Sequence, residues 1–293
     1  MTSSELPHIH IVGAGRVGGF LARALADQAR QITSWTRSRS RWERLPAELQ
    51  ARCQVGSALN VPSTARIVLL CVPDDALARI VNALATTVDR EPPRLWLHVS
   101  GVSPVSVLHP LGPLIGAMHP LQSIPTADSP VNTLTGAVLA LSGCDEALAF
   151  GRAFASSVGA RELLVPDSAR ASYHAAAVLA GNGVFALLDA AASLAAGAGL
   201  DSQVLLHGLC RLAQTSAANV DRVGLHEALT GPAVRGDAGT LLKHRLALGP
   251  GTDSDALYVL LARRLVDLAE HAGQLDMARA AAVRSVLEDQ GQE

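Results

Sequence analysis

The 293-residue chain has few aromatic residues, one lysine and few cysteines. Aromatic residues make up 3% of it, so its cores must be filled mainly by alanine, leucine and valine. Lys243 is the only lysine, and the formal net charge is −2. This charge gives no reason to expect nucleic acid or an anionic membrane as a partner.

The cysteines and histidines also lack the spacings of a metal site. No C-x-x-C pair occurs among Cys53, Cys71, Cys144 and Cys210, so neither a zinc site nor a disulfide framework is expected. No metal is assigned, because seven of the histidines show no metal-ligand spacing: His8, His10, His109, His207, His226, His244 and His271. The opening residues do not form a signal peptide, and no apolar run reaches about 18 residues. We therefore expect a soluble cytoplasmic protein.

The most informative stretch lies near the start of the chain. An apolar segment ending at Val12 leads into GAGRVG (13–18) and then into an amphipathic helical pattern. A strand, a G-x-G-x-x-G turn and a helix, in that order, are typical of a dinucleotide site. Gly13 permits the tight turn, Gly15 a close backbone approach to a pyrophosphate, and Gly18 close packing of helix on strand. Arg16 and Val17, between these glycines, are also expected to contact the cofactor.

The basic segment after the second predicted strand (31–36) indicates which dinucleotide is bound. An NAD site usually has an acidic residue there, but this chain has Arg37, Ser38 and Arg39. Guanidinium and hydroxyl groups suit a 2′-phosphate, which a carboxylate would repel. We expect NADP(H), with Arg37 as the best single candidate. The alternative is a solvated basic loop.

The order of elements predicts an α/β fold with two domains. Short apolar stretches at 65–72, 94–99, 114–118 and 137–141 alternate with helical patterns, as in a doubly wound Rossmann sheet. From Ser168 onward the patterns are helical only. We place an NADP(H)-binding domain at 1–165 and an all-α substrate and dimerisation domain at 166–293.

Residues that follow the predicted strands are expected to border one crevice. Val72 and Pro73 follow one strand, Ser100 and Gly101 the next, and His119 the one after. Ligands of such sheets bind beyond the carboxyl ends of the strands. Ser100 and Gly101 would lie near the nicotinamide, or simply form a turn. His119 could donate a proton, or could be a structural histidine bonded to the backbone.

Two further groups could take part in the chemistry. His174 and Asn182 are eight residues apart on a predicted helix and share one face, so His174 could supply a proton and Asn182 orient a substrate. Alternatively, His174 merely caps or packs the helix. Arg235 could bind a substrate carboxylate, or could form an ion pair with Asp237 that braces a turn.

These motifs resemble a Rossmann-like NADP oxidoreductase family whose C-terminal half is a helical domain of unknown function. The resemblance rests on GAGRVG (13–18), RSRS (37–40), VLLCVPDDAL (68–77), HVSG (98–101), HPLQS (119–123), YHAAAVLAGN (173–182) and TGPAVRGDAGTLLKH (230–244). The family is similar to ketopantoate reductases, pyrroline-5-carboxylate reductases and deazaflavin-linked NADP oxidoreductases. The kinship implies NADP(H), a homodimer formed through the helical domains and an active site between the domains.

One departure bears on the mechanism. Ketopantoate reductases have a catalytic lysine on the first helix after the Rossmann domain, where the spacing here gives His174. Of the asparagines that follow in that family, only Asn182 matches. We expect an NADPH-dependent reductase of a small carbonyl or imine substrate, most plausibly a 2-oxo acid such as ketopantoate. The alternatives are a non-catalytic NADP(H) sensor and a cyclic imine reductase of the pyrroline-5-carboxylate type.

Overall fold

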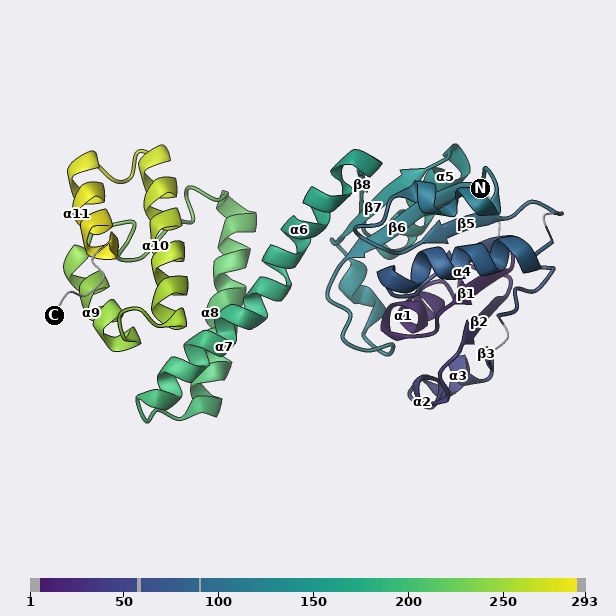
Figure 1. Cartoon of the computed structure of the whole chain (residues 1–293), viewed down its shortest axis with the longest axis horizontal. Coiled ribbons are helices and arrows are strands. Elements are labelled where there is room, and N and C mark those ends of the chain that lie inside the picture. Colours follow the sequence, from purple (N-terminus) through teal and green to yellow (C-terminus); the bar gives the residue numbers. More distant parts are fainter. Residues whose placement is uncertain (1–5, 57–58, 90, 289–293) are drawn as a thin grey trace. The chain divides into compact units, whose positions relative to one another are not determined.

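The computed structural model describes residues 6–56, 59–89 and 91–288, and it divides into two compact units (Figure 1). The first unit runs to Gly181 and the second begins at Asn182. The division follows helix α6 (Arg170–Ala180), whereas the sequence boundary at 165/166 precedes it. The helix belongs to the first unit because the buried Arg170 at its start bonds to Ser100 and Ser142.

Within the described residues, the first unit has one sheet of eight strands in the order β3-β2-β1-β4-β5-β6-β7-β8. The strands are β1 (Ile9–Val12), β2 (Ile32–Thr36), β3 (Cys53–Val55), β4 (Ile67–Leu70), β5 (Leu95–His98), β6 (Ile115–Leu121), β7 (Val138–Gly143) and β8 (Arg161–Leu164). All neighbours pair in parallel except β6 and β7. The chain reverses its direction of winding between β1 and β4, which makes this the switch point of a doubly wound sheet. The predicted fold class is confirmed.

Helices cover both faces of this sheet because its strands alternate their apolar side chains (Figure 1). On one face, Leu69 packs in a core with α1 (Arg16–Ala24) and α5 (Asp145–Val158). On the other, Val68 and Leu70 pack with α4 (Asp74–Thr87) and the 3-10 segment η1 (Val105–Leu111). The shorter helical elements are α2 (Arg39–Trp42), α3 (Ala47–Gln50), η2 (Val131–Leu134) and η3 (Asp167–Ala169).

The second unit consists of α7 (Asn182–Gly197), α8 (Ser202–Val223), α9 (Ala238–Leu248), α10 (Asp253–His271) and α11 (Met277–Glu288). Its apolar core is built from α9, α10, α11 and the turn before α9, with Leu241, Val266 and Val283 fully buried. A buried ion pair joins α9 to α10, since the Arg245 guanidinium donates two 2.9 Å hydrogen bonds to the Asp255 carboxylate. In contrast, α8 buries no residue and α7 buries only Ala195.

One helical stretch, Asp167–Gly197, is long and apolar enough to cross a membrane by length and composition alone. Its most apolar 18-residue window has a mean hydropathy of 1.6, and none of that window is buried. The sequence pattern predicts one uninterrupted helix here, but Gly181 separates α6 from α7. Leu179 (77%) and Phe185 (64%) are among its exposed apolar side chains.

Candidate functional site

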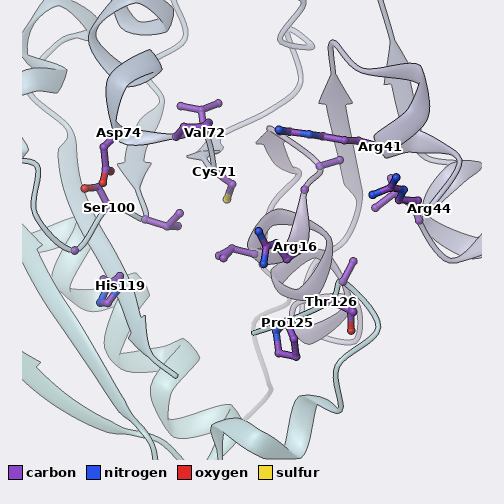
Figure 2. Close-up of a pocket in the computed structure, with 18 of the residues that line it drawn as sticks. Arg16, Arg41, Arg44, Cys71, Val72, Asp74, Ser100, His119, Pro125 and Thr126 are labelled. Carbon is purple, nitrogen blue, oxygen red and sulfur yellow. The ribbon is translucent and has the colours of Figure 1, made fainter. Parts of the chain in front are cut away.

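A cavity of about 790 Å³ lies in the first unit, at the switch point of the sheet (Figure 2). Its walls are the segments that follow β1 (Ala14–Val17), β4 (Cys71–Asp74) and β5 (Val99–Gly101), together with the loop Pro125–Asp128. Arg41, Arg44, Leu45, His119 and His174 complete the lining. Parallel α/β sheets bind ligands at this edge, so the cavity is the candidate functional site.

The glycine-rich turn places the N-terminus of α1 in this cavity. Gly13 has a φ of +101°, and a Cβ there would collide with the Cys71 carbonyl oxygen on β4's exit. Gly15 has open space around its Cβ position and lines the cavity. No side chain caps α1, and its first turn carries no acidic residue. Its free N–H groups and positive dipole end therefore suit a phosphate, as the sequence predicts.

Among the described residues, three arginines line the cavity: Arg16 is a predicted cofactor contact, whereas Arg41 and Arg44 are not among the predicted residues. Arg41 and Arg44 line the cavity with Arg16, and Figure 2 shows them across the view from Ser100 and His119. The two are three residues apart at α2 and its exit, so they reach the same side. The exposed Arg37 is not among the lining residues.

The residues around α2 explain why Arg41 and Arg44, and not Arg37, line the cavity. Ser38 caps α2, because its hydroxyl accepts a hydrogen bond from the Arg41 backbone N–H at 3.2 Å. Arg39 lies over the Trp42 ring at 4.3 Å and pairs with Glu43 at 3.2 Å. Ser38 and Arg39 thus build the short helix that presents the later arginines.

Polar groups gather at the other end of the cavity. The Ser100 hydroxyl accepts hydrogen bonds from the backbone N–H groups of Val102 (3.2 Å) and Ser103 (2.8 Å), so it shapes the turn after β5. Gly101 faces two imidazoles: a Cβ there would lie 2.5 Å from His174 Nδ1 and 3.1 Å from His119 Nε2. The predicted Ser100, Gly101, His119 and His174 are therefore brought together.

His119 is the most strongly perturbed group at this end. Its Nδ1 lies 2.7 Å from the Tyr173 hydroxyl, and its ring stands nearly perpendicular to that of His174, with centroids 5.9 Å apart. Burial lowers the pKa of His119 to about 4, with further lowering by His174 and Arg170 and an opposing effect of Asp74. The imidazole is therefore uncharged at neutral pH. The sequence places His119 after its strand, but β6 continues to Leu121 because His119 pairs with Ala140 of β7.

Arg170 and Tyr173 are members of the site that the sequence analysis does not identify. Arg170 is only 1% exposed; it donates to the Ser142 hydroxyl at 2.8 Å and to the backbone carbonyl of Ser100. Burial lowers the pKa of Arg170, although the residue stays a cation. Arg170 lies three residues before Tyr173 and four before His174, so it shares a helix face with each of them. An arginine on that otherwise apolar face is the signal that could have found them.

Asn182 and Arg235 lie in the second unit. Asn182 is exposed and begins α7, and Arg235 is exposed in the turn before α9. Asp237 uses both carboxylate oxygens on Thr240, at 3.0 Å to its N–H and 2.7 Å to its hydroxyl, and so caps α9. These hydrogen bonds lower the pKa of Asp237, with a smaller contribution from Arg235. Helix capping, more than an ion pair, therefore stabilises the turn.

Within residues 6–56, 59–89 and 91–288, no group of three or more His, Cys, Asp or Glu side chains is placed to hold a metal ion.

Two family models match the chain. Residues 3–121 match a Rossmann-like domain, and residues 137–265 match a domain of unknown function, DUF2520. The chain joins a Rossmann-like domain to a DUF2520 domain. The DUF2520 match starts one residue before β7, so it includes β7 and β8 as well as helices α5 to α9 and most of α10. The resemblance inferred from the motifs is thereby confirmed.

Solved structures share this fold across nearly the whole chain. TM1727 from Thermotoga maritima is 22% identical with a TM-score of 0.68, and the match covers 90% of this chain and 98% of that one. A putative NADP oxidoreductase, BF3122 from Bacteroides fragilis, is 24% identical with a TM-score of 0.72 over 89% and 98%. An imine reductase from Pseudomonas sp. is 17% identical with a TM-score of 0.57 over 96% and 99%. No curated protein matches the chain significantly.

Proposed function

We propose that this Rossmann–DUF2520 protein is an NADP(H)-dependent reductase of a small carbonyl or imine compound. The observation that carries the proposal is the cavity itself. It joins an uncapped helix N-terminus to an arginine pair at one end and to imidazoles at the other. The structural neighbours described as an NADP oxidoreductase and an imine reductase support the same class of chemistry.

The residues present fit a dinucleotide phosphate. Gly15 leaves open the space at the start of α1 that a larger side chain would fill, so the pyrophosphate would bind at Ala14–Val17. Arg41 and Arg44 would hold the 2′-phosphate, since guanidinium groups bind phosphate through paired hydrogen bonds. Val72 and Pro73 form the wall between the two ends. When bound, NADPH supplies a hydride to the substrate.

The chain's own residues then orient the substrate. His119 and His174 present imidazole nitrogens beside Gly101, where a carbonyl oxygen or imine nitrogen would be positioned for reduction. Arg170 fixes the Ser100 carbonyl and so the wall on which the two rings lie. Asn182 and Arg235 stay proposals as an orienting group and a carboxylate ligand. A 2-oxo acid such as ketopantoate is the first substrate to try.

Cofactor titration with arginine variants tests this assignment. We expect the wild-type chain to bind NADPH more tightly than NADH, and Arg41→Gln or Arg44→Gln to weaken NADPH roughly ten- to a hundredfold, the value of one lost charge-assisted pair. NADH affinity should hardly change. Arg37→Gln is the matched control, because Arg37 does not line the cavity. Equal weakening of both nucleotides, or an effect confined to Arg37, would contradict the assignment.

A substrate screen separates the reductase from a sensor. NADPH oxidation would be followed with ketopantoate, other 2-oxo acids and cyclic imines. Turnover of a 2-oxo acid supports the leading substrate class, and turnover of cyclic imines alone supports the imine reductase. Tight NADPH binding without turnover of any member would favour the non-catalytic sensor.

We also propose that α7 and α8 are covered by a second copy of the chain. Phe185 is 64% exposed, Val204 71% and Leu212 63%, so the apolar α7 and the amphipathic α8 both present apolar side chains to solvent. Asp189 lies in the apolar stretch of α7, which disfavours lipid as the cover. Light scattering should give twice the chain mass of 30.4 kDa, and Phe185→Asp should give the monomer. A monomeric wild type, or flotation with lipid vesicles, would contradict this proposal.

A further inference from the structure

A phenol hydroxyl and an uncharged imidazole can each donate or accept a hydrogen bond, and the chemistry of the two groups favours Tyr173 as the donor to His119. The Tyr173 oxygen lies 2.7 Å from His119 Nδ1, and the two rings meet edge to face at 88°. Burial raises the pKa of Tyr173 to about 12, so the phenol keeps its proton. A protonated phenol hydroxyl is a good donor, and an uncharged imidazole has one nitrogen free to accept.

The other ring nitrogen of His119, Nε2, lies near Gly101 at the wall of the cavity. His119 Nε2 is 3.1 Å from the position of a Cβ on Gly101, and both residues line the cavity. The absence of a side chain at position 101 therefore lets both imidazoles pack against the backbone, and Nε2 is the nitrogen of His119 that Tyr173 leaves available to a ligand in the cavity. Figure 2 shows His119 at the same end of the cavity as Ser100.

We infer that Tyr173 holds His119 in the tautomer whose proton is on Nε2, so that an uncharged imidazole donates a hydrogen bond into the cavity. Tyr173 is thus a positioning residue that acts through His119. The identity of the acceptor, a substrate carbonyl oxygen or imine nitrogen, rests on the proposed function. The tautomer itself rests only on the contacts of the free chain.

The surroundings of the ring keep it uncharged. Burial above all, and then His174 and Arg170 on α6, disfavour a cationic His119, while Asp74 at the start of α4 partly opposes them. A neutral imidazole can still polarise a carbonyl by donating a hydrogen bond, and it does so over the whole neutral pH range. This arrangement needs no proton transfer from His119, so the proton that completes the reduction would come from water that enters the cavity. It differs from a lysine ammonium donor in carrying no charge.

Nitrogen NMR of the full chain tests the tautomer without cofactor or substrate. The protein would be labelled with ¹⁵N-histidine, and the His119 signals would be assigned by their loss in His119→Gln. We expect wild-type His119 to show only the Nε2–H tautomer, and Tyr173→Phe, which removes just the hydroxyl, to show a mixture of both. A wild-type Nδ1–H tautomer, or no change in Tyr173→Phe, would overturn the inference.

Tyr258→Phe is the matched control, because the Tyr258 oxygen lies 2.7 Å from His244 Nδ1 in the second unit. It should alter the His244 signals and leave those of His119 unchanged; a change at His119 would overturn the local origin of the effect. In turnover assays, Tyr173→Phe should lower kcat roughly tenfold and leave the Kd for NADPH unchanged. If NADPH fails to bind while the Nε2–H tautomer is observed, the proposed function fails and the tautomer assignment stands.

Discussion

The chain contains two histidine–tyrosine pairs with almost the same geometry. His119 and Tyr173 in the first unit have a 2.7 Å bond and ring centroids 5.6 Å apart at 88°. His244 and Tyr258 in the second unit have a 2.7 Å bond and centroids 5.7 Å apart at 82°. Only their environments differ: the first pair is part-buried against a cavity, and the second is exposed.

The difference shows that surroundings, rather than the pair itself, create a candidate catalytic group. The pKa of His119 is lowered to about 4 by burial and by His174 and Arg170. Gly101 lets this ring and that of His174 pack against the backbone at the cavity wall. The geometry of the two pairs does not distinguish them. The part-buried position of His119 beside a cavity is what makes it the candidate catalytic group.

The largest effect that separates the two units is their response to acid. Burial lowers the pKa values of His10 and His98 to about 4, and both residues are 0% exposed in the first unit. In the unfolded chain a histidine takes up a proton as the pH falls through 6.5, whereas these two buried histidines stay uncharged until about pH 4. The free energy of unfolding of the first unit is therefore highest above pH 6.5 and decreases as the pH falls towards 4. Each group contributes roughly 3 kcal/mol at most.

In the second unit, hydrogen bonds from Arg245 lower the pKa of the buried Asp255. The ionised Asp255 therefore stabilises the folded unit, and this stabilisation is lost only below about pH 4. The first unit should therefore unfold first on acidification. Its unfolding can be followed separately, because all three tryptophans (Trp35, Trp42 and Trp96) lie in it. Helical circular dichroism that is lost before the tryptophan signal changes would contradict this order.

The next effect concerns turnover. His119→Gln should lower kcat by roughly a hundred- to a thousandfold, the usual cost of removing one donor to a developing charge, and should leave NADPH affinity nearly unchanged. His244→Gln is the counterpart from the exposed pair and tests whether burial separates the two. If His174→Gln, rather than His119→Gln, abolishes turnover, the donor is His174 and the comparison fails.

Gly101→Ala sharpens the comparison by disturbing the packing of the part-buried pair. The new Cβ would lie 2.5 Å from His174 Nδ1 and 3.1 Å from His119 Nε2, so both rings must move. A displacement of this size in a reacting geometry costs on the order of a hundredfold in kcat. Gly56→Ala is the control, because its Cβ position is open. Full activity in Gly101→Ala would show that the rings do not act at this position.

The smallest effect is expected at the exposed pair. Tyr258→Phe removes a hydrogen bond that water can replace, so the free energy of unfolding should fall by less than about 1 kcal/mol. Urea unfolding followed by circular dichroism measures it. A loss of several kcal/mol would mean that this pair is a structural element of the second unit.

Much of the first unit could be predicted from the sequence because its strands are buried on both faces. β4 is a continuous apolar run, and β1 and β5 each hold one histidine among buried apolar residues. The glycine motif fixes the turn after β1. The edge strands β3 and β8 could not be predicted, since β3 has three residues and all four residues of β8 are exposed. Neither strand carries the apolar run that indicates a buried strand.

The site was predictable where it follows strand ends and unpredictable where it depends on distant contacts. Ser100 and Gly101 follow an apolar strand and His119 lies near the end of another, which places them at one edge of the sheet. Arg170 contacts Ser100 from 70 residues away, and no pattern in the sequence encodes that contact. The basic segment at 37–44 was evident, but which arginines face the cavity depends on the short helix α2 that Ser38 caps.

The most direct test is a pH titration of the His119 ring by NMR in the full chain without ligands. The account predicts a midpoint at about pH 4, with the imidazole uncharged throughout the neutral range. A midpoint near 6.5, the value of an unperturbed histidine, would mean that His119 is solvated and can carry a charge, and the neutral donor would be ruled out.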